Sequence, residues 1–159
     1  MRRVIMMLAL LLATTLPCLA ADEQRMRVFR VLDGDSLLLR DRTQSMRVQL
    51  AGIDAPELNQ PGGQFSLKTL EKMVLGQRVT MTVVGENTVG DPLVDVRMLK
   101  YDIALEMVRA GAAWASPDGG PELRTAEHDA RLAGKGIWTL GAPTPMPPWQ
   151  WRTEHGDVD

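Results

Sequence analysis

Three acidic residues stand at the ends of short apolar runs, where they could do chemistry together. Asp35 lies in Val-Leu-Asp-Gly-Asp-Ser at 31–36, and Asp54 and Glu57 lie in Leu-Ala-Gly-Ile-Asp-Ala-Pro-Glu at 50–57. A strand that turns sharply at such residues points their carboxylates into solvent beside the neighbouring strand's turn. Carboxylate oxygens gathered in this way suit the hard cations Ca²⁺ and Mg²⁺ better than softer metals. If the chain performs chemistry, we expect it here.

Each of these residues also has a purely structural interpretation. Asp-Gly pairs are common in hairpin turns, so Asp35 could serve only to cap the turn at 33–35. Asp54 and Glu57 could likewise do no more than stabilise the Asp-Ala-Pro-Glu turn. The residue types alone leave both interpretations open.

Short aliphatic runs and a helix must position these carboxylates. We predict three strands of a meander, at 26–32, 36–40 and 46–51. A loop at 60–63 precedes a helix that Gly76 ends, because its apolar residues recur at helical spacing at Leu67, Leu70 and Val74.

Two more strands and two more helices are expected after this helix. The strands are predicted at 78–84, with an inward face of Val79, Met81 and Val83, and at 93–99. Strands first and then helices, with one helix inserted after the third strand, is the order of an OB-type barrel. The predicted fold is therefore α+β, a five-stranded OB-type β-barrel with three packed helices.

The later helices have recognisable ends. Asp102 is expected to cap the second helix, which Gly111 ends. Pro121 is expected to begin the third helix, which ends at Gly134 and has an inward face of Leu123, Ala126, Ala130 and Ala133. Two tryptophans that follow helix-end glycines, Trp114 and Trp138, are expected in the core. Trp149 and Trp151 are expected to pin the proline-rich tail to the barrel, with fraying after Arg152.

Several motifs together resemble the staphylococcal nuclease (thermonuclease-like) domain family. Besides the two acidic segments, they are Arg-Ala-Gly-Ala-Ala-Trp at 109–114, Gly-Lys-Gly-Ile-Trp at 134–138 and Pro-Pro-Trp-Gln-Trp-Arg at 147–152. They occur in the family's order and span residues 26–152. The resemblance implies an OB-type barrel that supports Ca²⁺-dependent cleavage of DNA and RNA phosphodiesters.

The resemblance also implies a role for each acidic residue. Asp35 and Asp54 occupy the family's metal positions, with the Ala55 carbonyl as a further ligand. Glu57 occupies the position of the general base that acts on the attacking water. The implied cofactor is Ca²⁺, with Mg²⁺ or no metal as alternatives.

Both arginines that neutralise the phosphate in the family are replaced. The first position holds Gln49, which carries no charge, and the second holds Asp91, which carries the opposite charge. Arg47, one pleat repeat before Gln49, could contact the substrate in their place. Arg97 and Lys100, toward and just past the end of the fifth strand, are the other cations that could substitute for them. Weak or degenerate phosphodiesterase activity is therefore expected, and a non-catalytic OB module that binds nucleic acid, a glycan or a protein is the alternative.

The first twenty residues resemble a signal peptide. Arg2 and Arg3 precede an apolar run at 4–16, and Cys18-Leu19-Ala20 forms a small-residue cleavage site. The run is shorter than the roughly 20 residues of a membrane span, and a lipid anchor on Cys18 is the alternative. We expect export to the periplasm or the extracellular medium, a nuclease-like OB domain at 21–141 and a Pro/Trp-containing tail at 142–159.

The charge balance argues weakly against a nucleic-acid partner. Without Arg2 and Arg3, 16 of the 18 lysines and arginines remain against 20 acidic residues, a net charge of −4. Nucleic-acid affinity comes largely from cations placed against phosphates, but a local basic patch can suffice. The expected partner is nucleic acid if the protein is active, and otherwise an unknown ligand or protein, bound by a monomer.

Overall fold

The protein is described by a computed structural model over residues 22–139 and 144–156. The predicted signal peptide and the predicted boundary between residues 141 and 142 lie outside the described residues. Within the described residues, no helix is long and apolar enough to cross a membrane.

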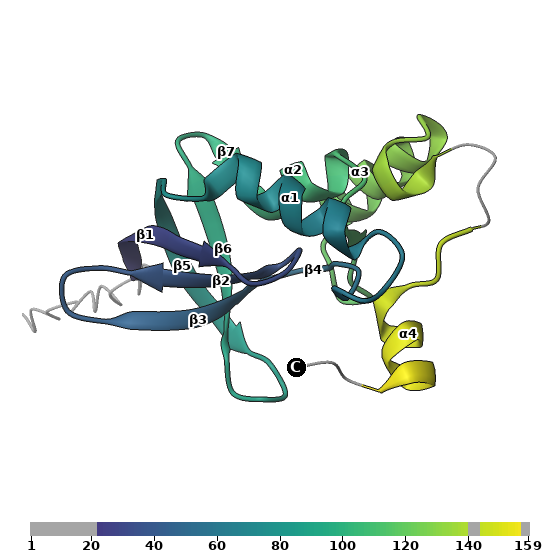
Figure 1. Cartoon of the computed structure of the whole chain (residues 1–159). Helices are drawn as coiled ribbons and strands as arrows, with labels where there is room; N and C mark the ends of the chain where they lie inside the picture. Colours follow the sequence, from purple (N-terminus) through teal and green to yellow (C-terminus); the bar gives the residue numbers. More distant parts are fainter. Residues whose placement is uncertain (1–21, 140–143, 157–159) are drawn as a thin grey trace, which may run out of the picture.

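Five strands close into a barrel (Figure 1). They follow the order β3-β2-β1-β5-β6 through antiparallel pairs, and a parallel pairing of β3 with β6 closes the circle. Closure satisfies the edges that an open sheet would expose. The predicted five-stranded barrel is thus confirmed, with strands β1 (Glu23–Val31), β2 (Ser36–Arg40), β3 (Ser45–Leu50), β5 (Arg78–Glu86) and β6 (Pro92–Met98).

Three two-residue strands supplement the barrel. β7 (Tyr101–Asp102) pairs antiparallel with the end of β6, and β4 (Ile53–Asp54) pairs with β8 (Trp114–Ala115). In the second pair Asp54 lies opposite Trp114, which fixes the backbone at one of the predicted metal ligands. Two-residue strands are too short to show an alternation of apolar and polar residues, so the sequence pattern did not predict them.

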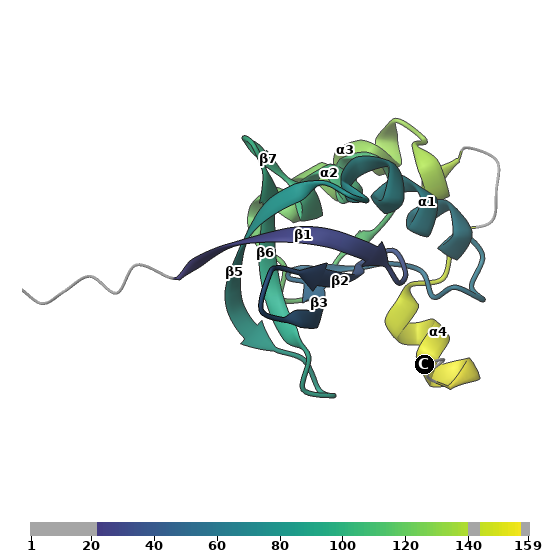
Figure 2. The ribbon, with the colours of Figure 1, turned by 60° about the vertical axis from the view of Figure 1, so that its left-hand side comes forward.

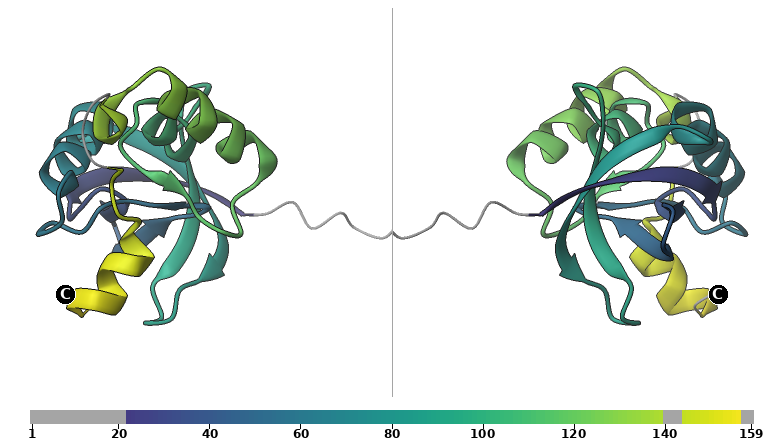
Figure 3. Two further views of the ribbon diagram at one scale, coloured as in Figure 1. Left: turned by 90° about the vertical axis from the view of Figure 1, so that its right-hand side faces the viewer. Right: turned by 90° about the vertical axis from the view of Figure 1, so that its left-hand side faces the viewer.

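The three predicted helices pack over one side of the barrel in both Figure 1 and Figure 2. They are α1 (Gly63–Val74), α2 (Ile103–Arg109) and α3 (Pro121–Leu132), followed by a short 3₁₀ helix, η1 (Gly136–Trp138). Asp102 caps α2 as predicted, because its carboxylate accepts a hydrogen bond from the Leu105 backbone N–H at 3.1 Å. A fourth helix, α4 (Pro148–His155), was not predicted, and it lies apart from the other three (Figure 3). Its last three residues continue past Arg152, where fraying was expected.

The barrel interior is filled by aliphatic side chains from alternate strand positions and from α1, including Val28, Leu37, Leu39, Val48, Leu70 and Met81. Two predicted inward residues are exposed instead. Val83 is 47% exposed because the pairing of β1 with β5 ends at Thr82, so nothing from β1 covers it. Ala133 lies one residue beyond the end of α3 and is also exposed.

Trp114 and Trp138 form a second small cluster with Ala130, as expected of core tryptophans. Their rings meet edge to face with centroids 4.8 Å apart, a favoured aromatic geometry. The cluster links α3 and η1 to β8, which in turn pairs with the strand that carries Asp54.

Candidate active site

Two turns bring the predicted carboxylates to one end of the barrel. Asp35 immediately precedes β2, and one of its carboxylate oxygens accepts a hydrogen bond from the Ala55 backbone N–H at 2.9 Å. This bond joins the β1–β2 turn to the Asp-Ala-Pro-Glu turn. The turn-capping role belongs to Asp33, whose carboxylate accepts from the backbone N–H groups of Asp35 and Ser36 at 2.9 and 2.7 Å. Asp35 therefore does more than cap its own turn.

The site is buried, and its carboxylates repel one another. Asp35 and Asp54 are only 6% and 8% exposed. Burial, and then the charges of Asp33 and Asp54, raise the pKa of Asp35 well above its ordinary value. Burial likewise raises the pKa values of Asp54 and Glu57, although hydrogen bonds from Arg152 act in the opposite direction. Such a site favours either protonation or a cation.

Arg152, on α4, binds two of the three carboxylates. Its Nη1 and Nη2 donate to the two carboxylate oxygens of Asp54 at 3.0 and 2.7 Å, a bidentate pair. Nη1 also donates to Glu57 Oε1 at 2.7 Å. The pKa of Arg152 is raised, chiefly by its hydrogen bond with Asp54. The guanidinium thus supplies a positive charge where the carboxylates gather.

The loop after Asp54 holds α4 in place. Gln60 is 5% exposed, and its side-chain amide donates to the Met146 carbonyl at 2.6 Å while its Oε1 accepts from the Glu57 backbone N–H at 3.1 Å. The Trp151 indole N–H donates to Asn59 Oδ1 at 3.3 Å, as expected of a residue that pins the tail. Trp149 is 37% exposed.

Sequence reasoning missed Arg152 as a site residue. A signal was present, because Pro147-Pro148 before Trp-Gln-Trp-Arg is typical of a helix start with proline at the first position. A helix at this position holds Arg152 in a fixed place, from which it can contact residues distant in the sequence such as Asp54.

The two positions that hold arginine in the resembled family face partners within this chain. Gln49 Oε1 accepts a hydrogen bond from the Asn87 side-chain amide at 2.9 Å. Asp91 forms an ion pair with Arg47, with Arg47 Nε and Asp91 Oδ2 3.1 Å apart. Arg47 therefore neutralises the negative charge that Asp91 brings to this position. The same pair holds the side chain that was predicted to contact substrate.

The other two proposed substitutes lie elsewhere. Arg97 is near the end of β6, whereas β6 meets β3 and Gln49 at its beginning, through Leu93. The Lys100 ammonium lies 5.5 Å from the ring centroid of Tyr101 on β7. Neither residue joins the carboxylate cluster.

The donor set fits a hard cation in type. Asp35 and Asp54 offer buried carboxylate oxygens whose mutual repulsion a divalent ion would relieve. In the described part of the chain, no three side chains of histidine, cysteine, aspartate or glutamate are grouped to hold a metal. A cation would therefore depend on two carboxylates, the Ala55 carbonyl and water, and it would compete with Arg152 for Asp54.

Residues 47–140 match the family described as "Staphylococcal nuclease homologue". The chain belongs to the staphylococcal nuclease family. The family resemblance expected from the motifs is confirmed, and so is the OB-type α+β fold. The matched segment contains Asp54, Glu57 and both substituted arginine positions, whereas Asp35 and Arg152 lie outside it.

Curated relatives agree with this assignment. The chain is 37% identical over 139 residues to an "Uncharacterized endonuclease" of Escherichia coli O157:H7, covering 86% of this chain and 89% of the relative. It is 35% identical over 157 residues to an "Uncharacterized endonuclease" of Haemophilus influenzae, covering 97% and 87%. It is also 33% identical over 136 residues to "Probable staphylococcal-like nuclease CAN2" of Oryza sativa subsp. japonica, covering 84% of this chain and 35% of that protein.

Proposed function

We propose that this protein hydrolyses phosphodiester bonds of nucleic acids with the help of Ca²⁺, or Mg²⁺ in its place, and does so slowly. The observation that carries the proposal is the convergence of Asp35, Asp54 and Glu57 at one end of the barrel, with Arg152 bound to two of them. Membership of the staphylococcal nuclease family and relatives named endonuclease support the same substrate class.

Glu57 is the proposed general base. Burial raises its pKa, which makes the carboxylate a better proton acceptor for an attacking water than an exposed glutamate. Arg152 orients this carboxylate through the 2.7 Å hydrogen bond to Oε1. Asp35 and Asp54 would hold the cation, whose charge would polarise a phosphoryl oxygen of the substrate.

The proposed slowness follows from the two substituted positions. Gln49 is neutral, and Asp91 with Arg47 forms a pair of zero net charge. Neither offers the forked cation that stabilises the developing charge on phosphate. The same observations favour a second candidate function, a non-catalytic OB module that binds nucleic acid, a glycan or a protein. In that case Arg152 would occupy the cation position permanently.

A degradation assay separates the two functions. Plasmid and single-stranded DNA are incubated with the protein in Ca²⁺, Mg²⁺, Mn²⁺ or EDTA. We expect slow, metal-dependent cleavage that Glu57→Gln slows by a further ~10²–10⁴-fold. Glu71→Gln on α1 is the matched control, because it removes the same charge from a glutamate outside the site. Cleavage that persists in EDTA, or that Glu57→Gln leaves at the wild-type rate, would contradict the proposed role. No cleavage by wild type under any condition would favour the non-catalytic binding module.

A further inference from the structure

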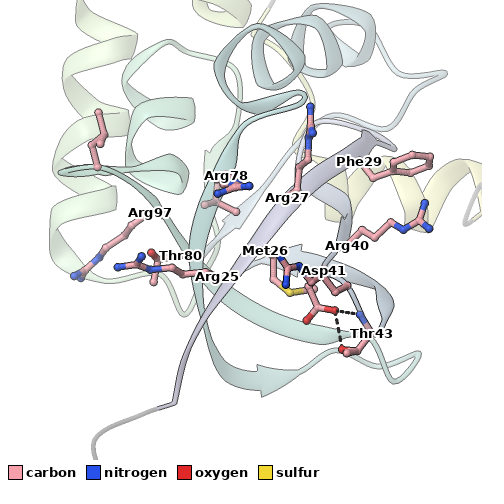
Figure 4. Close-up of a pocket in the computed structure, with 13 residues that line it drawn as sticks. Arg25, Met26, Arg27, Phe29, Arg40, Asp41, Thr43, Arg78, Thr80 and Arg97 are labelled. Carbon is pink, nitrogen blue, oxygen red and sulfur yellow. Dashed lines mark hydrogen bonds between the residues drawn. The ribbon is translucent and has the colours of Figure 1, made fainter.

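Six arginines line a recess of about 900 Å³ on the barrel (Figure 4). Asp35, Asp54 and Glu57 are not among the residues that line it. We call it the arginine face; its members are Arg25, Arg27, Arg40, Arg42, Arg78 and Arg97. All six are exposed, in a chain whose formal net charge is −2. A positive field so concentrated on an acidic protein indicates an anionic partner.

The register of the strands forces these charges together. Arg27 on β1 lies directly opposite Arg40 on β2 and directly opposite Arg78 on β5. In the next row, Thr80 on β5 lies opposite both Arg25 and Arg97. Like charges at directly opposite positions destabilise a sheet, and they share one face of it. The fold therefore bears a repulsion that an anionic ligand would relieve.

Nearby carboxylates do not neutralise the arginine face. Among the described residues, none of the six arginines forms an ion pair within 4.0 Å. Asp41 lines the face, but one oxygen of its carboxylate accepts hydrogen bonds from the Thr43 N–H and hydroxyl and from the Gln44 N–H. Asp102, opposite Arg97, caps α2, and Asp95 precedes Arg97 by two positions on the same face of β6. Glu23 precedes Arg25 by two positions on the same face of β1. Four carboxylates against six arginines leave the face positive.

An exposed aromatic ring lies among the arginines. The register between β1 and β2 shifts between Val28 and Arg30, so Phe29 is the extra residue of a β-bulge. Bulges re-aim side chains, and Phe29 is 58% exposed, with the Arg40 guanidinium 5.6 Å from its ring centroid. A ring held beside cations is the arrangement on which nucleic-acid bases stack.

We propose that the arginine face binds single-stranded nucleic acid, with phosphates against the arginines and a base on Phe29. The concave shape and the aromatic ring favour single-stranded nucleic acid over a membrane surface as the partner, because binding to a flat membrane needs no recess. β2 runs from Ser36, beside the carboxylates, to Arg40, a rise of roughly 13 Å. A short single strand of nucleic acid can therefore contact both the arginine face and the carboxylates. This binding goes beyond the proposed cleavage and does not require it.

The test is a binding titration in EDTA, where the proposed cleavage is switched off. A fluorescein-labelled oligothymidylate of twelve nucleotides is titrated with wild type, Arg25→Ala/Arg40→Ala/Arg97→Ala and Lys68→Ala/Lys72→Ala/Lys135→Ala, and anisotropy is recorded. The lysine variant removes the same charge from outside the arginine face. Release of ~0.7 counterion per phosphate at ~0.1 M salt is worth about fivefold per contact, so the arginine variant should bind about 100-fold more weakly. Its slope of log Kd against log salt should fall by about 2.

Two further measurements sharpen the outcome. Phe29→Ala should weaken binding of the oligothymidylate and leave binding of an abasic oligomer of equal length unchanged. Melting temperatures should be unchanged or raised in the arginine variant, since repulsion is removed. Equal binding by wild type and the arginine variant would overturn the proposal, as would binding of phosphatidylglycerol vesicles without binding of the oligonucleotide. Absence of cleavage in the degradation assay would leave this titration untouched, so the two failures are distinguishable.

Discussion

The surroundings of Asp35 disfavour the ionised form of its carboxyl group. Burial and the charges of Asp33 and Asp54 raise its pKa well above the ordinary value of 3.8, so ionisation costs stability in the folded protein. The stability associated with protonated Asp35 is fully present below the unfolded pKa and is lost as pH rises through the folded pKa. At neutral pH without a cation, this residue therefore opposes folding.

Asp35→Asn should accordingly stabilise the protein in EDTA at pH 7. We expect the melting temperature to rise by about 3 °C, the shift that ~1 kcal/mol produces in a domain of this size. The gain should vanish below about pH 4, where wild-type Asp35 is itself protonated. Asp118→Asn is the control, because the pKa of Asp118 is lowered, chiefly by the hydrogen bond from Ser116, and its loss should not stabilise. A melting temperature at pH 7 equal to or below that of wild type would contradict this account.

Gln49 limits the proposed rate because it brings no charge to the phosphate. A unit charge at ~6 Å in an effective dielectric of ~20 is worth roughly 3 kcal/mol. Gln49→Arg should therefore speed cleavage of single-stranded DNA by about 100-fold, even though it loses the hydrogen bond from Asn87. Ala133→Arg adds the same charge at an exposed position after α3 and should change the rate little. An unchanged initial rate in Gln49→Arg would mean that this position does not face the substrate.

Among the elements, α4 places a cation, Arg152, against the carboxylates of Asp54 and Glu57. Replacing Arg152 by methionine would leave Asp54 and Glu57 without its three hydrogen bonds. Because the Arg152 side chain is one-third exposed, we expect Arg152→Met to lower the free energy of unfolding by about 1–3 kcal/mol. This is less than the loss expected when one partner of a fully buried ion pair is removed. Arg109→Met, which removes an exposed partner of Glu106, should cost under ~1 kcal/mol.

The same variant tests competition for Asp54. If Arg152 and Ca²⁺ share the oxygens of Asp54, millimolar Ca²⁺ should raise the melting temperature of Arg152→Met by more than it raises that of wild type. Wild-type affinity is expected near ~10⁻⁴–10⁻³ M, the weak end of the calcium range. An equal shift in both proteins would show that the two cations do not compete, and a shift that survives in Asp54→Ala would place the ion elsewhere.

Elements with a strong period or a clear cap were predictable from the sequence. The barrel strands, the Asp102 cap and the Pro121 start of α3 are where the sequence puts them, because each is set by local chemistry. Elements set by tertiary contact were not predictable. β4 and β8 exist only as partners of each other. Pro147-Pro148 did signal the start of α4, but nothing local signalled that Arg152 binds Asp54 across 98 residues of sequence. The pairing of Arg47 with Asp91 was likewise missed, because Arg47 lies on β3 and Asp91 in the loop before β6, far apart in the sequence.

At the scale of the whole molecule, opposite charges collect at separate places on one barrel. The net charge of the chain argued against nucleic acid, but it sums over residues that the fold separates. Strand register gathers five arginines on one face, to which Arg42 in the β2–β3 turn adds a sixth, while turns gather three carboxylates at one end. A local field, rather than the total charge, decides where phosphates bind.

The pattern of basic, apolar and small residues at 1–20 predicts a signal peptide. We propose export and a mature chain that begins at Ala21. N-terminal sequencing of protein recovered from the periplasm or medium should begin there. Retention of Met1 in the mature protein would contradict the proposal, and a lipid-modified Cys18 would indicate an anchored form.

Glu57 is the proposed base of a phosphodiesterase whose cation would be held by Asp35 and Asp54. The most direct test is the single-turnover rate of DNA cleavage in Ca²⁺ as a function of pH. For wild type, the rate should fall as pH falls through the pKa of Glu57, which burial raises above 4.5. Glu57→Gln should be slower by about 10²–10⁴-fold and lose this limb of the profile. A Glu57→Gln profile that coincides with that of wild type would contradict the account.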